Sequence, residues 1–186
     1  MAARSKPTVY AALLRGINLG ARNRLPMADL RGLVEDLGCT DVSTYVQSGN
    51  VVLRSDRRAP ELAKAIEEGI RKSAGLDVPA VVRTAQQVWR LVDRNPFAGP
   101  KAAPNELHVT FLVEKPARER VRRLAERSFE PERFEIVGTD VYLSCPDGYG
   151  RSKLTNAMFE RQLGVAATTR NWRTVCALAE LAAAVG

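Results

Sequence analysis

The hydrophobic pattern in the first half of the chain predicts a β-α-β-β-α-β series of elements. A strand is indicated where apolar residues run together or alternate, and a helix where they recur every three or four positions. On this basis we predict a strand at residues 8–15, a helix at 26–38, a strand hairpin at 41–55, a helix at 60–75 and a strand at 77–84. This order is that of the ferredoxin-like fold, a split β-α-β unit.

The second half of the chain repeats this pattern less completely. After a further helix at 85–94, residues 95–105 contain three prolines and a glycine, which is typical of a linker. Beyond it we predict a strand at 106–115, a helix at 116–128, a hairpin at 133–145, and helices at 152–164 and 169–186. We therefore predict an α+β protein of two ferredoxin-like (βαββαβ-type) subdomains. They comprise residues 1–94 and 106–186, and the second is incomplete and carries an extra C-terminal helix.

A long polar connection follows the first predicted strand. In this fold the first two strands run parallel, so the connection and the turn of the first hairpin lie at the same end of the sheet. Guanidinium and amide donors together suit a phosphate or carboxylate, although such side chains can also serve only to satisfy the backbone of a loop. The predicted ligand-binding residues are Arg15, Asn18, Asn23 and Arg24 of the connection and Gln47, Ser48 and Asn50 of the turn.

Two segments of the second half could contribute further anion contacts. The segment TTRNWRT, residues 168–174, is expected to begin the last helix, with Thr168 or Thr169 as its cap. A cation in the first helical turn opposes the helix dipole unless an anion is bound there. The segment at 145–155 is a Gly-rich turn without Walker A spacing, and it equally suits a simple change of chain direction. The candidates from both segments are Ser152, Lys153, Arg170 and Asn171.

The sequence offers few groups for catalysis or for metal binding. The single histidine, His108, lies within a predicted strand and is expected to be structural. A Ser–His–Asp or Cys–His set therefore cannot be assembled elsewhere, and the three cysteines lack the spacing of a metal site. Asp29 and Asp147 are the acids nearest to the proposed sites and could act as a general base. Catalytic residues and cofactors are not predicted, and whether the protein is an enzyme stays open.

Composition and charge limit the possible partners. The chain is 45% hydrophobic and 26% charged, as in ordinary globular domains, and its apolar runs fall short of the ~20 residues of a membrane helix. Scattered cysteines suit a reducing compartment, so we expect a cytoplasmic protein without a membrane partner. A net charge of +7 keeps nucleic acid among the possible partners. The third predicted strand nevertheless lacks the aromatic residues on which RNA-recognition motifs stack bases.

Four segments in order resemble one known family: ALLRGINLGARNRLPMADLRGLVEDLG, TYVQSGNVVL, GRSKLTN and TTRNWRTV. They are similar to the bacterial domain-of-unknown-function family DUF1697, and the resemblance extends from about Tyr10 to Leu181. It implies an α+β protein of two ferredoxin-like subdomains, with no established activity, substrate or cofactor. The family's loop has a Gly-Gly-Lys-Asn character, so Ala21 and Arg22 depart from it.

The sequence favours a protein that binds an anionic ligand in an Arg/Asn-lined cleft. The ligand could be a nucleotide, a phosphorylated metabolite or a nucleic-acid backbone. One alternative is a transferase or hydrolase that acts on a phosphorylated substrate through arginine electrostatics. Another is a nonspecific nucleic-acid-binding protein that relies on diffuse charge. The oligomeric state and the identity of the ligand are not predicted.

Overall fold

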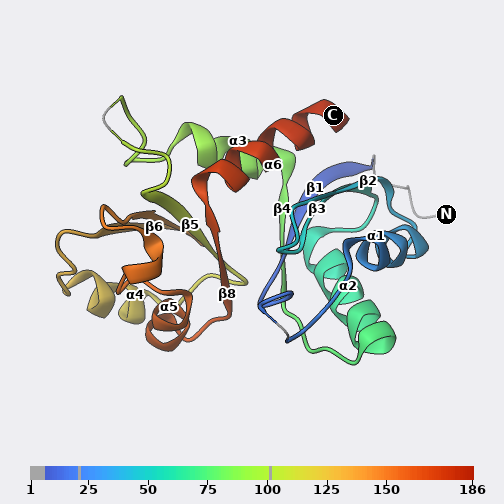
Figure 1. Ribbon diagram of the computed structural model, residues 1–186, viewed down its shortest axis with the longest axis horizontal. Coiled ribbons are helices and arrows are strands. Elements are labelled where there is room, and N and C mark those ends of the chain that lie inside the picture. Colours follow the sequence, from blue (N-terminus) through green and yellow to red (C-terminus); the bar gives the residue numbers. More distant parts are fainter. Residues whose placement is uncertain (1–6, 21, 101) are drawn as a thin grey trace. The chain divides into compact units, whose positions relative to one another are not determined.

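The computed structural model describes residues 7–20, 22–100 and 102–186, which form two α+β units (Figure 1). The first unit runs to Arg90 and also includes Ala177–Gly186, and the second unit is Leu91–Cys176. Each unit contains a four-stranded antiparallel sheet. The predicted class, α+β with two ferredoxin-like subdomains and a C-terminal helix, is confirmed. In the described part of the chain, every helix is too short or too polar to span a membrane.

The first unit has the β-α-β-β-α-β order that the hydrophobic pattern predicts. Its sheet has the strand order β2-β3-β1-β4, and all neighbouring strands are antiparallel. The elements are β1 (Thr8–Leu14), α1 (Met27–Asp36), β2 (Thr40–Tyr45), β3 (Asn50–Ser55), α2 (Ala59–Ala74) and β4 (Ala80–Thr84), followed by α3 (Ala85–Asp93).

The core of the first unit lies between one face of the sheet and helices α1 and α2. Alternate residues of β1 enter this core, because successive side chains of a strand point to opposite faces. Leu30 and Val34 of α1 and Ile66 and Ile70 of α2 supply the helical side, each at the four-residue spacing of one helix face. Helix α2 ends at Gly75, whose φ of 66° is the left-handed conformation typical of a C-terminal glycine.

The second unit repeats the same topology with the strand order β6-β7-β5-β8. Its core includes Leu112 and Leu143 of the two inner strands of the sheet, together with Leu124 and Phe159 of the helices. The elements are β5 (Leu107–Leu112), α4 (Arg118–Ala125), β6 (Arg133–Val137), β7 (Asp140–Ser144), the short 3₁₀ helix η1 (Tyr149–Arg151), α5 (Asn156–Leu163), β8 (Ala167–Asn171) and α6 (Trp172–Val185).

Strand β8 corrects the prediction that the second subdomain is incomplete. Residues expected to begin the last helix instead pair antiparallel with β5, with Thr169 opposite Thr110, and α6 begins at Trp172. The hydroxyl groups of these two threonines lie 2.8 Å apart, within hydrogen-bond distance. The segment ATTRN is polar and short, so its sequence lacks an apolar strand pattern. Its strand conformation depends on tertiary pairing with β5.

Candidate functional site

The connection after β1 lies beside the β2–β3 turn, as the strand directions predict. The backbone N–H of Leu14 donates to the carbonyl of Gly49 at 2.8 Å, and Nδ2 of Asn18 donates to the carbonyl of Gln47 at 2.8 Å. Two segments that are about thirty residues apart in sequence are thus joined by direct hydrogen bonds. They form the polar end of the first unit's sheet.

Asn18 holds the two ends of the connection together and fastens them to the turn. Its Nδ2 donates to the carbonyls of Leu25 (2.9 Å) and Gln47, and its Oδ1 accepts the Leu25 N–H at 2.8 Å. Both N–H groups of the amide are therefore engaged by the backbone. Asn18 shapes the site, and its amide has no further N–H for a ligand.

Asn23 and Asn50 also bind backbone groups. Nδ2 of Asn23 donates to the carbonyl of Gly16 at 3.0 Å. Nδ2 of the fully buried Asn50 donates to the carbonyl of Tyr45 at 3.0 Å and to Oγ of Ser48 at 2.9 Å. The structure thus contains the arrangement that the sequence left as an alternative, in which polar side chains satisfy the backbone of a long loop.

Unusual backbone conformations are concentrated in this loop and turn. Among the described residues, four that are not glycine have a positive φ, and three of them are Asn18, Asn23 and Val46. Val46 has a φ of 51°, which is costly for a β-branched side chain, yet half of its side chain is exposed to solvent. Such strained conformations persist only where the surroundings fix them, and they are found preferentially at functional sites.

Basic side chains project from this segment without acidic neighbours in the sequence. Residues 15–28 and 42–55 contain no Asp or Glu. Arg22 and Arg24 are exposed, and Arg24 makes no hydrogen bond or ion pair with any other residue that the structure describes. Arg15 is partly exposed, and its backbone N–H donates to the carbonyl of Pro79 at 2.9 Å. Ala21 lies outside the described residues.

In the second unit, Ser152 and Lys153 form part of the turn that leads into α5. Ser152 is buried, its Oγ accepts the backbone N–H of Leu154 at 2.9 Å, and it lies 3.5 Å from Sγ of Cys145. The backbone N–H of Lys153 donates to the carboxylate of Glu132 at 3.0 Å. These contacts give the turn a structural role, and a carboxylate already occupies one N–H that an anion would use.

Arg170 and Asn171 do not lie where the sequence placed them. Because Arg170 belongs to β8, it is not in the first turn of a helix, and its buried guanidinium donates to Oγ1 of Thr168 (2.6 Å) and to the carbonyl of Thr169 (3.0 Å). Burial lowers the pKa of Arg170 to about 10, so it stays charged at neutral pH. The cap of α6 is Asn171, whose Oδ1 accepts the Thr174 N–H at 2.9 Å, and not Thr168 or Thr169.

His108 is packed within the second unit. Its ring stacks on that of Tyr149, with centroids 4.6 Å apart, and burial lowers its pKa. No partner for its buried Nδ1 is found among the described residues. His108 and Tyr149 are 41 positions apart in the sequence, which explains why no local sequence pattern signals this pair. Across the same described residues, no three His, Cys, Asp or Glu side chains gather as a metal site.

Comparisons with known proteins give a family and a fold. The sequence model of a family described as "Protein of unknown function (DUF1697)" matches residues 8–142. Among solved structures, the conserved bacterial protein SP0830 from Streptococcus pneumoniae is similar, with a TM-score of 0.78 and 21% sequence identity. The match covers 95% of this chain and 99% of that one, and at this identity it shows the fold alone. No curated protein matches the chain.

Proposed function

The chain belongs to the DUF1697 family, and we propose that the β1–α1 loop and the β2–β3 turn bind a ligand through its phosphate or carboxylate group. One observation carries the proposal. A loop with two left-handed asparagines, fastened to its neighbouring turn by Asn18, presents Arg24 to solvent in a segment without acids. Guanidinium groups favour planar or tetrahedral oxyanions because their N–H groups can donate in parallel.

The residues of the site divide into two roles under this proposal. Arg24 and Arg15 of the loop supply positive charge. Gln47 has an exposed side chain and belongs to the turn that Asn18 fastens to this loop. Asn18, Asn23 and Asn50 position the backbone and do not themselves hold the anion, because their amide donors bind carbonyl groups and Ser48. A pre-formed loop reduces the ordering entropy that ligand binding would otherwise cost.

The same chemistry admits a nucleotide, a phosphorylated metabolite or a nucleic-acid backbone. These ligands differ in how their affinity depends on salt. A nucleic acid that contacts several basic side chains would bind much more weakly as salt rises, because each contact releases condensed counterions. A mononucleotide or sugar phosphate would show a smaller salt effect. A salt titration therefore assigns the ligand class once binding is found.

The test is calorimetric titration of the native protein with inorganic phosphate, ADP and a single-stranded oligonucleotide. We expect at least one of them to bind, and Arg24→Gln to weaken that binding about tenfold, as for loss of one charge-assisted contact. Arg161→Gln is the matched control, because it removes the same charge from an exposed position on α5 in the other unit. Its affinity should equal that of the native protein.

Two results would overturn the proposal. One is the absence of binding by all three probes at low salt. The other is an equal loss of affinity in Arg24→Gln and Arg161→Gln, which would indicate attraction to the net charge of the protein rather than to this loop. Thermal melting of both variants checks that the fold is unchanged.

A further inference from the structure

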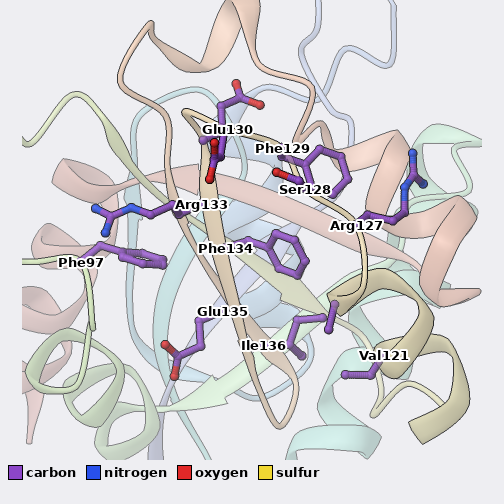
Figure 2. A pocket seen from close by; sticks show the side chains of 12 residues that line it. Phe97, Val121, Arg127, Ser128, Phe129, Glu130, Arg133, Phe134, Glu135 and Ile136 are labelled. Atoms are coloured by element: carbon purple, nitrogen blue, oxygen red, sulfur yellow. The ribbon is translucent and has the colours of Figure 1, made fainter.

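A groove of about 500 Å³ follows the outer edge of β6 in the second unit (Figure 2). Because β6 is the end strand of the order β6-β7-β5-β8, β7 occupies only one of its two edges. The groove is lined by Arg133 and Glu135, which point to one face of the sheet, and by Phe134 and Ile136, which point to the other. A groove with lining residues from both faces of one strand follows the edge of that strand.

The walls of this edge groove are apolar on the helix side and carry charged side chains on the other side. On the helix side, Phe134 lies 5.7 Å from Phe129 in an edge-to-face arrangement, measured between ring centroids. On the opposite side, the guanidinium of Arg133 lies over the ring of Phe97, 4.9 Å from its centroid (Figure 2). An added strand would therefore find apolar surface for the side chains that it directs to the helix side, and charged partners in Arg133 and Glu135 for those that it directs to the other side.

The backbone of β6 offers its unpaired groups at Phe134. Strands β6 and β7 are joined by the two-residue turn Gly138–Thr139, with Val137 opposite Asp140. The pair that closes such a turn exchanges hydrogen bonds, and bonded and non-bonded pairs alternate along the ladder. Phe134, three residues from the closing pair, thus turns its N–H and C=O away from β7 and toward the groove. Edge strands with such groups are templates for strand addition.

We propose that a second copy of this chain fills the groove, with the two β6 strands paired antiparallel about a two-fold axis at Phe134. The sequence Arg133-Phe134-Glu135 is its own electrostatic complement in this arrangement. Arg133 of each copy lies opposite Glu135 of the other, and the two Phe134 residues meet at the axis. A two-fold interface requires such self-complementarity, since each contact occurs twice.

Charge also selects this register over its neighbour. If the axis passed through Glu135 instead, Glu135 would face its own copy, and like charges directly opposite each other are destabilising. The pairing buries little surface, because β6 has five residues, so we expect a weak dimer that dissociates on dilution.

The experiment is sedimentation equilibrium of the full chain over a wide concentration range, with two charge-reversal variants. Arg133→Glu alone places two glutamates opposite two glutamates, and Glu135→Arg alone places two arginines opposite two arginines. We expect each to weaken dimerisation at least tenfold. An equimolar mixture of the two variants should restore the dimer, because every cross-strand pair in the mixed dimer is again of opposite charge.

Arg123→Glu is the matched control, since Arg123 is exposed on α4 and does not line the groove. It should dimerise like the native chain. As an independent readout, the amide of Phe134 should exchange with solvent more slowly as the protein concentration rises. A native chain that stays monomeric at all concentrations, or a dimer that survives in both single variants, would overturn the proposal, as would a failure of the mixture to associate.

Discussion

At the scale of single residues, Gly49 of the β2–β3 turn packs closely against Leu14 and Ile17, where β1 ends and the β1–α1 loop begins. It has a φ of 75°, and a Cβ built on it would lie 2.6 Å from Cδ1 of Ile17 and 2.8 Å from Cβ of Leu14. Gly49→Ala should therefore combine the cost of a left-handed alanine with that of overpacking. We expect it to lower the free energy of unfolding by about 2–4 kcal/mol, measured by urea denaturation.

Gly38→Ala separates the two causes. Gly38 also has a positive φ, of 86°, but nothing lies within 4 Å of the position that its Cβ would take. Only the backbone cost should apply, so we expect a loss of about 1–2 kcal/mol. Equal losses at the two positions would show that the close approach of Gly49 to Ile17 is not a constraint.

His108 should make the stability of the protein depend on pH. Burial lowers the pKa of His108 below its ordinary value of 6.5, so the folded state favours the neutral ring. Below about pH 6.5 the unfolded chain binds a proton that the folded chain resists, and stability falls as the pH decreases through this range. Above this range the contribution is fully present. We expect the urea midpoint to decline between about pH 7.5 and about pH 5.

The variant His108→Phe isolates this contribution from that of the carboxylates, which also titrate in acid. It retains an aromatic ring against Tyr149 but cannot be protonated. Its urea midpoint should change less between the two pH values than that of the native protein. The same pH dependence in both proteins would mean that His108 is as easily protonated when folded as when unfolded.

At the scale of elements, Asn18 joins the β1–α1 loop to the β2–β3 turn. Asn18→Gly removes three hydrogen bonds and tolerates the φ of 53°, so it introduces no backbone strain. We expect a loss of about 1–3 kcal/mol in the free energy of unfolding, because the Leu25 N–H and two carbonyls lose their partner. Hydrogen exchange should show faster exchange at the Leu25 amide.

Asn23→Gly provides the comparison within the same loop. Asn23 has a φ of 50° and donates one hydrogen bond, to the carbonyl of Gly16. Its replacement should therefore cost less than that of Asn18, about 1 kcal/mol or below. If the two variants were equally stable, the three contacts of Asn18 would contribute no more than the single contact of Asn23.

Elements with a strong hydrophobic pattern could be predicted from the sequence, and elements that depend on tertiary pairing could not. Helix α2, with Leu62, Ile66 and Ile70 on one face, was predicted to within one residue at its C-terminal end. Strand β8 was missed because two threonines and an arginine give no apolar alternation. Its buried positions and its pairing with β5 become visible only when the sheet has formed.

The same limit applies to the candidate site. Strand direction correctly placed the loop beside the turn, because that follows from topology. The role of each asparagine does not follow from topology, since an amide donates equally well to a ligand or to a carbonyl group. The structure assigns the donors of Asn18, Asn23 and Asn50 to the protein itself. The binding roles of Arg15 and Arg24 stay predictions.

At the scale of the whole molecule, the last ten residues belong to the first unit although they follow the second in sequence. Ala179 and Ala182 of α6 are buried, and they line a groove together with Val9 of β1 and Trp89 of α3. The guanidinium of Arg54 on β3 donates to the carbonyl of Val185. The sequence could not indicate this return of the chain, because the apolar pattern of α6 does not specify which sheet it packs against.

Two substitutions on one helix test whether the end of α6 stabilises the first unit. Ala182 is fully buried, whereas Ala184, two residues later, is exposed. A carboxylate at position 182 must be protonated or must disrupt its surroundings, so Ala182→Asp should lower the free energy of unfolding by several kcal/mol. Ala184→Asp should change it by less than about 0.5 kcal/mol. With Trp172→Phe as background in both, Trp89 fluorescence reports unfolding of the first unit. If Ala182→Asp unfolds at the same urea concentration as Ala184→Asp, the packing of α6 on this unit contributes nothing to its stability.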